Sequence, residues 1–193
     1  MVFQAEKVYC SLDLELTGFD PLRDKIVEVG FCFFVIRDNQ CHIIEEWSQL
    51  FNPNISVHQK ILGLTGISQS DLDTAPQWQE FAEFIKTKLS KATLVGHNIA
   101  MDIRFLEAAG IPIAEPAIDT LELVQFLMPT YHSYNLENLV HYFDLSSANA
   151  HRALADCQSV VKLLENLLQI FAKFSNSLQN DISDVIEKSE LPW

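Results

Sequence analysis

The stretch that most constrains the fold is residues 8–18, VYCSLDLELTG, because it reads as a strand with two acids among its leucines. Side chains alternate between the two faces of a β-strand, so the leucines share one face and Asp13 and Glu15 share the other. Paired carboxylates repel each other unless a cation lies between them, which favours a divalent metal site. The alternative is an edge strand whose acidic face is solvated.

Length and composition predict one globular domain, since 193 residues with 48% hydrophobic residues can bury a core. No apolar run reaches membrane-spanning length and the N-terminus lacks a secretory pattern, so we expect no membrane association. The four cysteines show no metal-type spacing, which indicates reduced thiols and a cytoplasmic protein. The net charge of −13 excludes a long basic surface, so contacts with nucleic acid should be short and local.

The order of the expected elements indicates the fold class. Strand-like segments with tight turns at 8–16, 26–36 and 41–51 predict an antiparallel three-strand meander. A loop or short helix is expected at 61–68, and short strands at 92–96 and 116–118. Helical spacing and caps then predict helices over 78–89, 100–109, 120–128, 135–143 and 153–174. This order predicts an α/β fold, a mixed sheet with flanking helices, and it resembles the ribonuclease-H-like architecture.

Two further acids lie on the apolar faces of predicted helices. Asp102 heads an apolar stripe at positions i, i+3, i+4 and i+7, and Asp156 heads a similar stripe in the last long helix. An ionised carboxylate is costly to bury without a partner. For Asp102 the alternative is a favourable interaction with the N-terminus of its own helix. Otherwise the four carboxylates converge on one side of the sheet.

Four carboxylates are an all-oxygen set of ligands, which suits Mg²⁺ or Mn²⁺, and shared carboxylates suit two ions about 3.5–4 Å apart. Zinc would need closely spaced His or Cys. His151 lies five residues before Asp156, so it would act best from the loop or first turn ahead of that helix. There an imidazole can remove a proton from a water at neutral pH, although a lone histidine is usually a surface or capping residue.

Three motifs resemble, in order, those of the DnaQ-like 3′–5′ exonucleases. They are DLELTG at 13–18, HNIAMD at 97–102 and HRALAD at 151–156. The family comprises the DEDDh enzymes, among them the proofreading epsilon subunit of bacterial replicative DNA polymerase, and the resemblance covers roughly residues 7–172. It implies a ribonuclease-H-like fold, two Mg²⁺ or Mn²⁺ ions, and hydrolysis of the 3′-terminal phosphodiester to release nucleoside 5′-monophosphates.

The resemblance also implies residue roles. By position in the motifs, His151 resembles the general base, and the metal ligands are Asp13, Glu15, Asp102 and Asp156. His97 is as much a structural candidate as a functional one. The loop at 64–67 departs from the usual Ile-His-Gly-Ile, so its first residue becomes the expected apolar contact. The residues expected beside the terminal nucleotide are Leu16, Thr17, Gly18, Leu64 and Asn98.

We therefore expect an exonuclease that acts on single-stranded or frayed DNA ends in proofreading or repair. No residue unambiguously reads a 2′-hydroxyl, so an RNA 3′–5′ exonuclease of the oligoribonuclease or RNase T type is the alternative. An inactive nuclease fold that serves as a binding module is the third reading. Scattered cations are expected to contact the few phosphates that an acidic protein can hold: Arg23, Lys25, Lys60, Arg104 and Arg152.

The predicted exonuclease domain spans residues 1–174, and residues 175–193 form a C-terminal tail. The apolar residues Leu178, Ile182, Val185 and Ile186 have the spacing of a two-turn amphipathic helix, which needs a surface to bury its stripe. That surface is either the domain or a partner, such as a polymerase, a helicase or a second copy. The Ser-Asn-Ser break at 175–177 favours packing outside the catalytic core.

Overall fold

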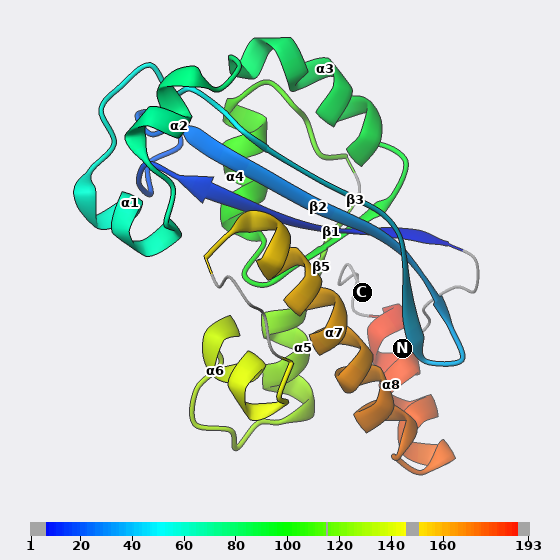
Figure 1. Cartoon of the computed structure of the whole chain (residues 1–193). Coiled ribbons are helices and arrows are strands. Elements are labelled where there is room, and N and C mark those ends of the chain that lie inside the picture. Colours follow the sequence, from blue (N-terminus) through cyan, green and yellow to red (C-terminus); the bar gives the residue numbers. More distant parts are fainter. Residues whose placement is uncertain (1–6, 115, 146–150, 189–193) are drawn as a thin grey trace.

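The computed structural model describes residues 7–114, 116–145 and 151–188, except for the side chains of residues 183 and 185–188. Its centre is a five-stranded sheet of order β3-β2-β1-β4-β5 (Figure 1). The first three strands pair antiparallel, β4 pairs parallel with β1, and β5 pairs parallel with β4, so the predicted mixed sheet with its meander is confirmed. The strands are β1 (Val8–Leu16), β2 (Ile26–Arg37), β3 (Gln40–Leu50), β4 (Thr93–Gly96) and β5 (Ile118–Asp119).

Helices cover both faces of the sheet (Figure 1). Two lie on one face, α3 (Trp78–Leu89) and α4 (Ala100–Ala108). On the other face lie α5 (Thr120–Leu127), α6 (Leu136–Tyr142), α7 (Ala153–Ala172) and α8 (Asn176–Lys188). Two short helices, α1 (Gln59–Thr65) and α2 (Gln69–Thr74), lie beyond the end of the sheet toward which β1 points. In the described part of the chain, no helix is both long and apolar enough to span a membrane.

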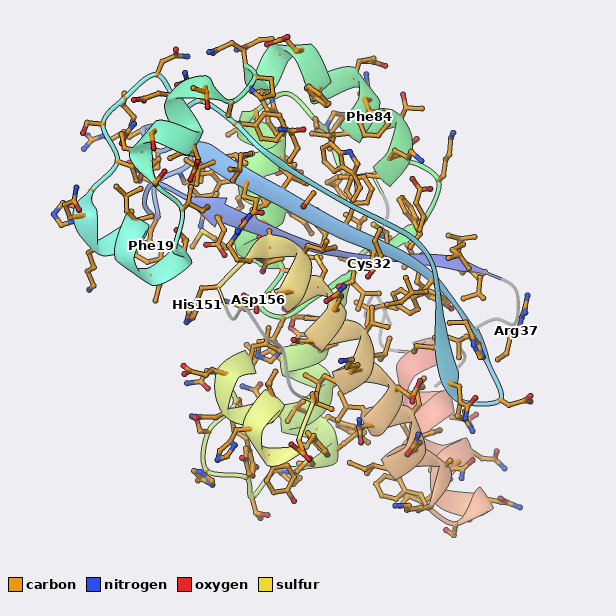
Figure 2. The ribbon with its side chains drawn as sticks, viewed as in Figure 1. Phe19, Cys32, Arg37, Phe84, His151 and Asp156 are labelled. Atoms are coloured by element: carbon orange, nitrogen blue, oxygen red, sulfur yellow. The ribbon has the colours of Figure 1, made fainter. Side chains whose placement is uncertain are left out.

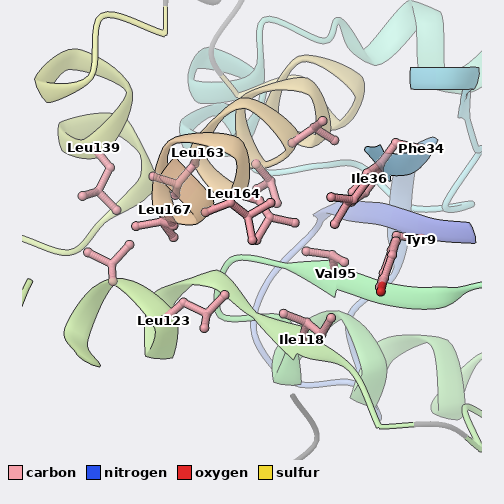
Figure 3. Close-up of a cluster of buried hydrophobic side chains, with 14 of the residues drawn as sticks. Tyr9, Phe34, Ile36, Val95, Ile118, Leu123, Leu139, Leu163, Leu164 and Leu167 are labelled. Carbon is pink, nitrogen blue, oxygen red and sulfur yellow. The ribbon is translucent and has the colours of Figure 1, made fainter. Parts of the chain in front are cut away.

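The strand β1 is buried on both faces, so the reading as an edge strand with a solvated acidic face is wrong. Leu12 and Leu14 belong to the cluster beneath α3 and α4. On the opposite face, Ser11 Oγ donates to the carbonyl oxygen of Cys157 in α7 at 3.0 Å. Figure 3 shows leucines of α7 packed against side chains of β1, β2 and β4 on this second face. The acids of β1 are half-buried and face a helix.

The segment predicted as a loop or short helix forms two capped helices. His58 Nδ1 accepts from the N–H of Lys60 at the start of α1, and Gly66 ends that helix with a φ of 68°. Ser68 and Asp71 form a reciprocal capping box at the start of α2. Such caps stabilise short helices that propensity alone would not sustain. The two helices lie beside the end of β1 (Figure 1).

Helix α8 is longer than the predicted two turns, and it contacts the domain. Ile182 is 8% exposed and belongs to the hydrophobic cluster that includes the leucines of α7. Gln179 Nε2 also donates to the carbonyl oxygens of Ala172 and Phe174 at the end of α7. Leu178 remains 44% exposed. The helix thus begins at the C-terminal end of α7, about 30 Å along that helix from its first turn, and runs back beside α7 (Figure 1).

A chain ending at Phe174 should keep its turnover on short single strands. Its melting temperature should fall by roughly 5 °C, because one buried isoleucine contributes about 1.5–3 kcal/mol and each kcal/mol shifts the midpoint by about 2–4 °C. It should also lose any self-association of the full chain. Thermal melting, sedimentation and nuclease assays of the two chains check this. Loss of turnover in a chain that is still folded would place α8 in the catalytic core.

Candidate active site

Three acids meet where the first turn of α7 crosses the second half of β1. Asp13 and Glu15 come from β1 and Asp156 from the first turn of α7. One carboxylate oxygen of each lies within 4.8 Å of the others, close enough to bind a common ion. The sheet brings the first two together by alternation, and the apolar stripe of α7 brings the third onto the same face.

The fourth acid, Asp102, reaches the end of β1 from α4. Its Oδ1 accepts a hydrogen bond from the N–H of Leu14 at 3.1 Å. The pairing of β4 with β1 ends at Ser11, so this carboxylate takes the place of a strand partner further along β1. Its charge is the strongest charge effect that raises the pKa of Asp13. The structure thus brings all four predicted ligands together, three as a compact group and Asp102 beside Asp13.

The acids have unusual protonation equilibria. Burial is the main cause, and it raises the pKa of Glu15 to about 8 and that of Asp102 to about 7. Burial and the neighbouring carboxylates also raise the pKa of Asp13 well above its usual range. Burial raises the pKa of Asp156, while His151 opposes that increase. A divalent cation would relieve both the desolvation and the repulsion, so the arrangement fits metal binding.

Without metal, the protein should lose thermal stability as the pH rises from 5 to 9. In the unfolded chain these acids ionise near pH 4, whereas in the folded chain Glu15 ionises at about 8 and Asp102 at about 7. Between these values the folded protein binds more protons, so raising the pH favours unfolding. Differential scanning calorimetry in EDTA should show a fall of roughly 5 °C or more. Glu15→Gln should reduce the fall in melting temperature. A melting temperature that is constant or rises with pH would contradict the raised pKa values of these acids.

His151 lies in the loop ahead of α7, two residues before its first residue, as the sequence predicted. Its backbone has a φ of 61°, a left-handed value that is uncommon for residues other than glycine. Its backbone N–H bonds the carboxylate of Asp156, and this bond and the charge of His151 both lower the pKa of that acid. Figure 2 shows His151 and Asp156 at the same end of α7. The half-buried histidine is therefore within reach of the acid cluster; residues 146–150 before it lie outside the described chain.

The turn that begins α4 is fixed by a network that the sequence did not predict. Asn98 has a φ of 61°, and its N–H donates to Asp119 at 2.8 Å. The two ring nitrogens of His97 lie 3.0 Å from Thr120 Oγ1 and 2.7 Å from the carbonyl oxygen of Tyr134. Because both ring nitrogens are engaged, His97 has a structural role. Asn98 itself is exposed, on the turn ahead of the helix that carries Asp102.

Of the residues expected beside a terminal nucleotide, those at 16–18 come directly after the acids of β1 in the chain. Leu16 to Gly18 directly follow Glu15, and Thr17 Oγ1 donates to Asp24 at 3.2 Å. A Cβ at position 18 would lie 2.4 Å from the carboxylate of that aspartate, so any larger residue there would have to displace the Asp24 side chain. Leu64 projects from α1 and is 55% exposed. Figure 2 shows that α1 and the exposed Phe19 lie at this end of the sheet.

Glu28 is a site residue that sequence reasoning missed. It is 1% exposed, and its carboxylate accepts from Nε and Nη2 of Arg152 at 3.0 and 2.9 Å. Arg152, one of the cations expected to contact phosphates, thus has two of its guanidinium nitrogens paired within the protein. Glu28 stands opposite Glu15 on the neighbouring strand. The signal that could have found it is an acid two residues before Gly30 in an otherwise apolar strand.

Comparison with known proteins places the chain in a family. The sequence profile of the RNase T family, described as exonuclease, matches residues 10–164. A 3′-5′ exonuclease DinG of Staphylococcus aureus is 32% identical over 170 residues, which are 86% of this chain and 18% of that protein. The chain thus spans about a fifth of the length of this curated relative.

Solved structures share the fold. Exonuclease X in complex with 5′ overhanging duplex DNA superimposes with a TM-score of 0.64 at 21% identity, covering 91% of this chain and 99% of that one. A 3′-exonuclease that recognises the histone mRNA stem-loop gives 0.71 at 16% identity, covering 86% and 65%. The fold is ribonuclease-H-like. With the profile matching most of its length, the chain belongs to the RNase T exonuclease family, and it fits the DnaQ-like group within it.

Proposed function

We propose that this chain is a metal-dependent 3′–5′ exonuclease that hydrolyses the 3′-terminal phosphodiester of single-stranded or frayed DNA. The observation that carries the proposal is the convergence of Asp13, Glu15 and Asp156, whose carboxylate oxygens lie within 4.8 Å of one another. Asp102 adds a fourth carboxylate beside this group. The membership of an exonuclease family and the 3′-5′ activity named for DinG support the same reading.

The side chains fit a pair of Mg²⁺ or Mn²⁺ ions. The group of described residues close enough to hold a common ion consists of carboxylates, and hard oxygen ligands suit these cations. Arg152 does not take the place of a metal ion by hydrogen-bonding these acids, because its guanidinium bonds Glu28. We assign Asp13, Glu15, Asp102 and Asp156 as the metal ligands. When bound, the ions would supply a more acidic attacking water and compensate charge on the scissile phosphate.

The remaining site residues would bind the nucleic-acid strand and accept the proton of the attacking water. His151 would accept the proton of the attacking water, since it lies ahead of α7 next to Asp156 and an imidazole nitrogen can act as a general base. Attack on phosphorus breaks the bond to the 3′ oxygen of the preceding nucleotide and releases a nucleoside 5′-monophosphate. The backbone of Leu16, Thr17 and Gly18 would hold the terminal nucleotide, with Leu64 and Asn98 at its edges.

The acidic surface favours short contacts with the strand. With a net charge of −13, the protein can neutralise few phosphates beyond the acid cluster. Of the five cations considered for that role, Arg152 is committed to Glu28, and Arg23 pairs with Asp20 at 3.5 Å on the surface. Single-stranded or frayed ends, held by their last nucleotides, therefore suit the site better than long duplexes. Through the exposed side of α8, a polymerase, a helicase or a second copy is the proposed protein partner.

DNA is the favoured substrate, and RNA is the second candidate. DNA is favoured because Exonuclease X, which shares the fold over nearly its whole length, binds 5′ overhanging duplex DNA. RNA is kept because another structural neighbour recognises a histone mRNA stem-loop. The two sugars differ by a 2′-hydroxyl, and only a residue that contacts it can distinguish them.

Matched DNA and RNA oligonucleotides of one sequence test the proposal. Each would be labelled at the 5′ end and incubated with Mg²⁺ or Mn²⁺, with EDTA as the control. We expect a ladder that shortens from the 3′ end, faster for DNA, and none in EDTA. Faster decay of RNA would make the chain an RNA exonuclease. No decay of either strand with metal present would leave the binding-module reading in place of the enzyme.

A further inference from the structure

The start of α7 is fitted closely onto β2. Glu28 and Gly30 are two residues apart on that strand, so both face α7. Glu28 accepts from the N–H of Ala153 at 3.3 Å, in addition to its two bonds from Arg152. A Cβ at Gly30 would lie 2.4 Å from the carbonyl carbon of Ala153, and Cys157 Sγ lies 3.2 Å from the oxygen of Gly30. The first turn therefore contacts the strand backbone directly.

Charge alone does not explain an acid at position 28. Glu28 lies opposite Glu15, and its charge raises the pKa values of Glu15 and Asp156. A buried carboxylate in an acidic cluster is unfavourable unless a cation and hydrogen bonds compensate it. Arg152 provides that cation. The Glu28–Arg152 pair therefore adds no net charge to the cluster. Its contribution is to fix the position of the start of α7.

The geometry reaches both functional residues of α7. The N–H of Asp156 donates to the carbonyl oxygen of Arg152 at 3.0 Å, so the backbone held by Glu28 is one hydrogen bond from Asp156. His151 is the residue directly before Arg152. A shift of Arg152 would therefore move the acid and the histidine together.

We infer that Glu28 is a positioning residue of the site: through Arg152 and the N–H of Ala153, it holds Asp156 and His151 against β1. This inference rests on the proposed function for the roles of Asp156 and His151. In this proposal Glu28 contacts neither the nucleic-acid substrate nor a metal ion. Partners in the layer behind metal ligands typically contribute about 10–100-fold to metal affinity or activity, because they fix the orientation of the ligands.

Calorimetric Mn²⁺ titration of the full chain is the first test, with kcat and KM on a short single strand as the second. Glu28→Gln keeps the size of the side chain but loses the ion pair. We expect Mn²⁺ affinity and kcat to fall about 10–100-fold. We expect KM to change by less than roughly threefold, because the substrate contacts are unaltered. Wild-type Mn²⁺ affinity and kcat in Glu28→Gln would overturn the inference.

Two substitutions of Arg152 separate position from charge. Arg152→Met removes a cation near the ion site, so charge alone predicts tighter Mn²⁺ binding, whereas lost positioning predicts weaker binding. Arg152→Lys keeps the charge but cannot form the two parallel bonds to Glu28. We expect both variants to bind Mn²⁺ more weakly and to turn over more slowly. Tighter or unchanged binding in Arg152→Met, or full activity in Arg152→Lys, would overturn the inference.

Glu45→Gln is the matched control, because it breaks the ion pair of Glu45 with Lys88 between β3 and α3, away from the acid cluster. It should change neither affinity nor kcat. Circular dichroism melts measure folding, and losses that only follow the folded fraction would overturn the inference. If Glu28→Gln does not fold, Arg152→Lys provides the test.

Failure of the proposed function has a different signature: the wild type binds Mn²⁺ but releases no nucleotide. The comparison of Mn²⁺ affinities between the wild type and the variants then still tests whether Glu28 positions the start of α7.

Discussion

Replacing any one of the four clustered acids should nearly abolish hydrolysis of a single-stranded DNA end. Removing one group that stabilises the charge of a transition state typically costs roughly 10²–10³-fold, and loss of a ligand to a shared ion should cost at least that. The substitutions are Asp13→Asn, Glu15→Gln, Asp102→Asn and Asp156→Asn. Single-turnover rates at saturating Mn²⁺ measure the effect.

The same variants should be as stable as the wild type, or more stable, when metal is absent. Each removes one buried charge from a group whose members repel one another. Asp102→Asn keeps an oxygen that can accept from Leu14. Glu83→Gln on the exposed face of α3 is the control and should behave as the wild type. If activity falls only in step with the folded fraction, the four acids are structural and the site assignment is wrong.

His151→Asn should lower the rate by about 10²–10⁴-fold, the usual cost of losing a general base, while Mn²⁺ affinity stays nearly unchanged. Asparagine suits the test because it tolerates the left-handed backbone of position 151 and cannot accept the proton. Single-turnover kinetics and calorimetric Mn²⁺ titration measure the two quantities. His132→Asn, on an exposed histidine, is the control. A large loss of Mn²⁺ affinity in His151→Asn would make the histidine a ligand and change its role.

The local patterns that could be read from the sequence are those that one element carries by itself. Alternation along β1 placed Asp13 and Glu15 on one face, and the helical stripes placed Asp102 and Asp156 toward the core. These patterns survive because burial of the neighbouring leucines fixes the faces. The bounds of β1 and α3 agree with the prediction for the same reason.

The features that could not be predicted from the sequence depend on contacts between residues far apart in the chain. The central place of β1 depends on β4, which is more than 70 residues away, so the edge-strand reading could not be excluded beforehand. Glu28 and Arg152 are 124 positions apart, and without the fold each is an isolated charge. Likewise, the structural role of His97 depends on Thr120 and Tyr134, which only the folded chain brings to it.

A single-stranded DNA labelled only in its 3′-terminal nucleotide shows whether the protein, with divalent metal at the acid cluster, removes nucleotides from the 3′ end. In Mn²⁺ the label should appear first as a nucleoside 5′-monophosphate, before any shorter oligonucleotide carries it, and EDTA or Asp156→Asn should stop the release. Label that appears first in internal fragments or as a 3′-monophosphate, or that is released equally in EDTA, would contradict the account.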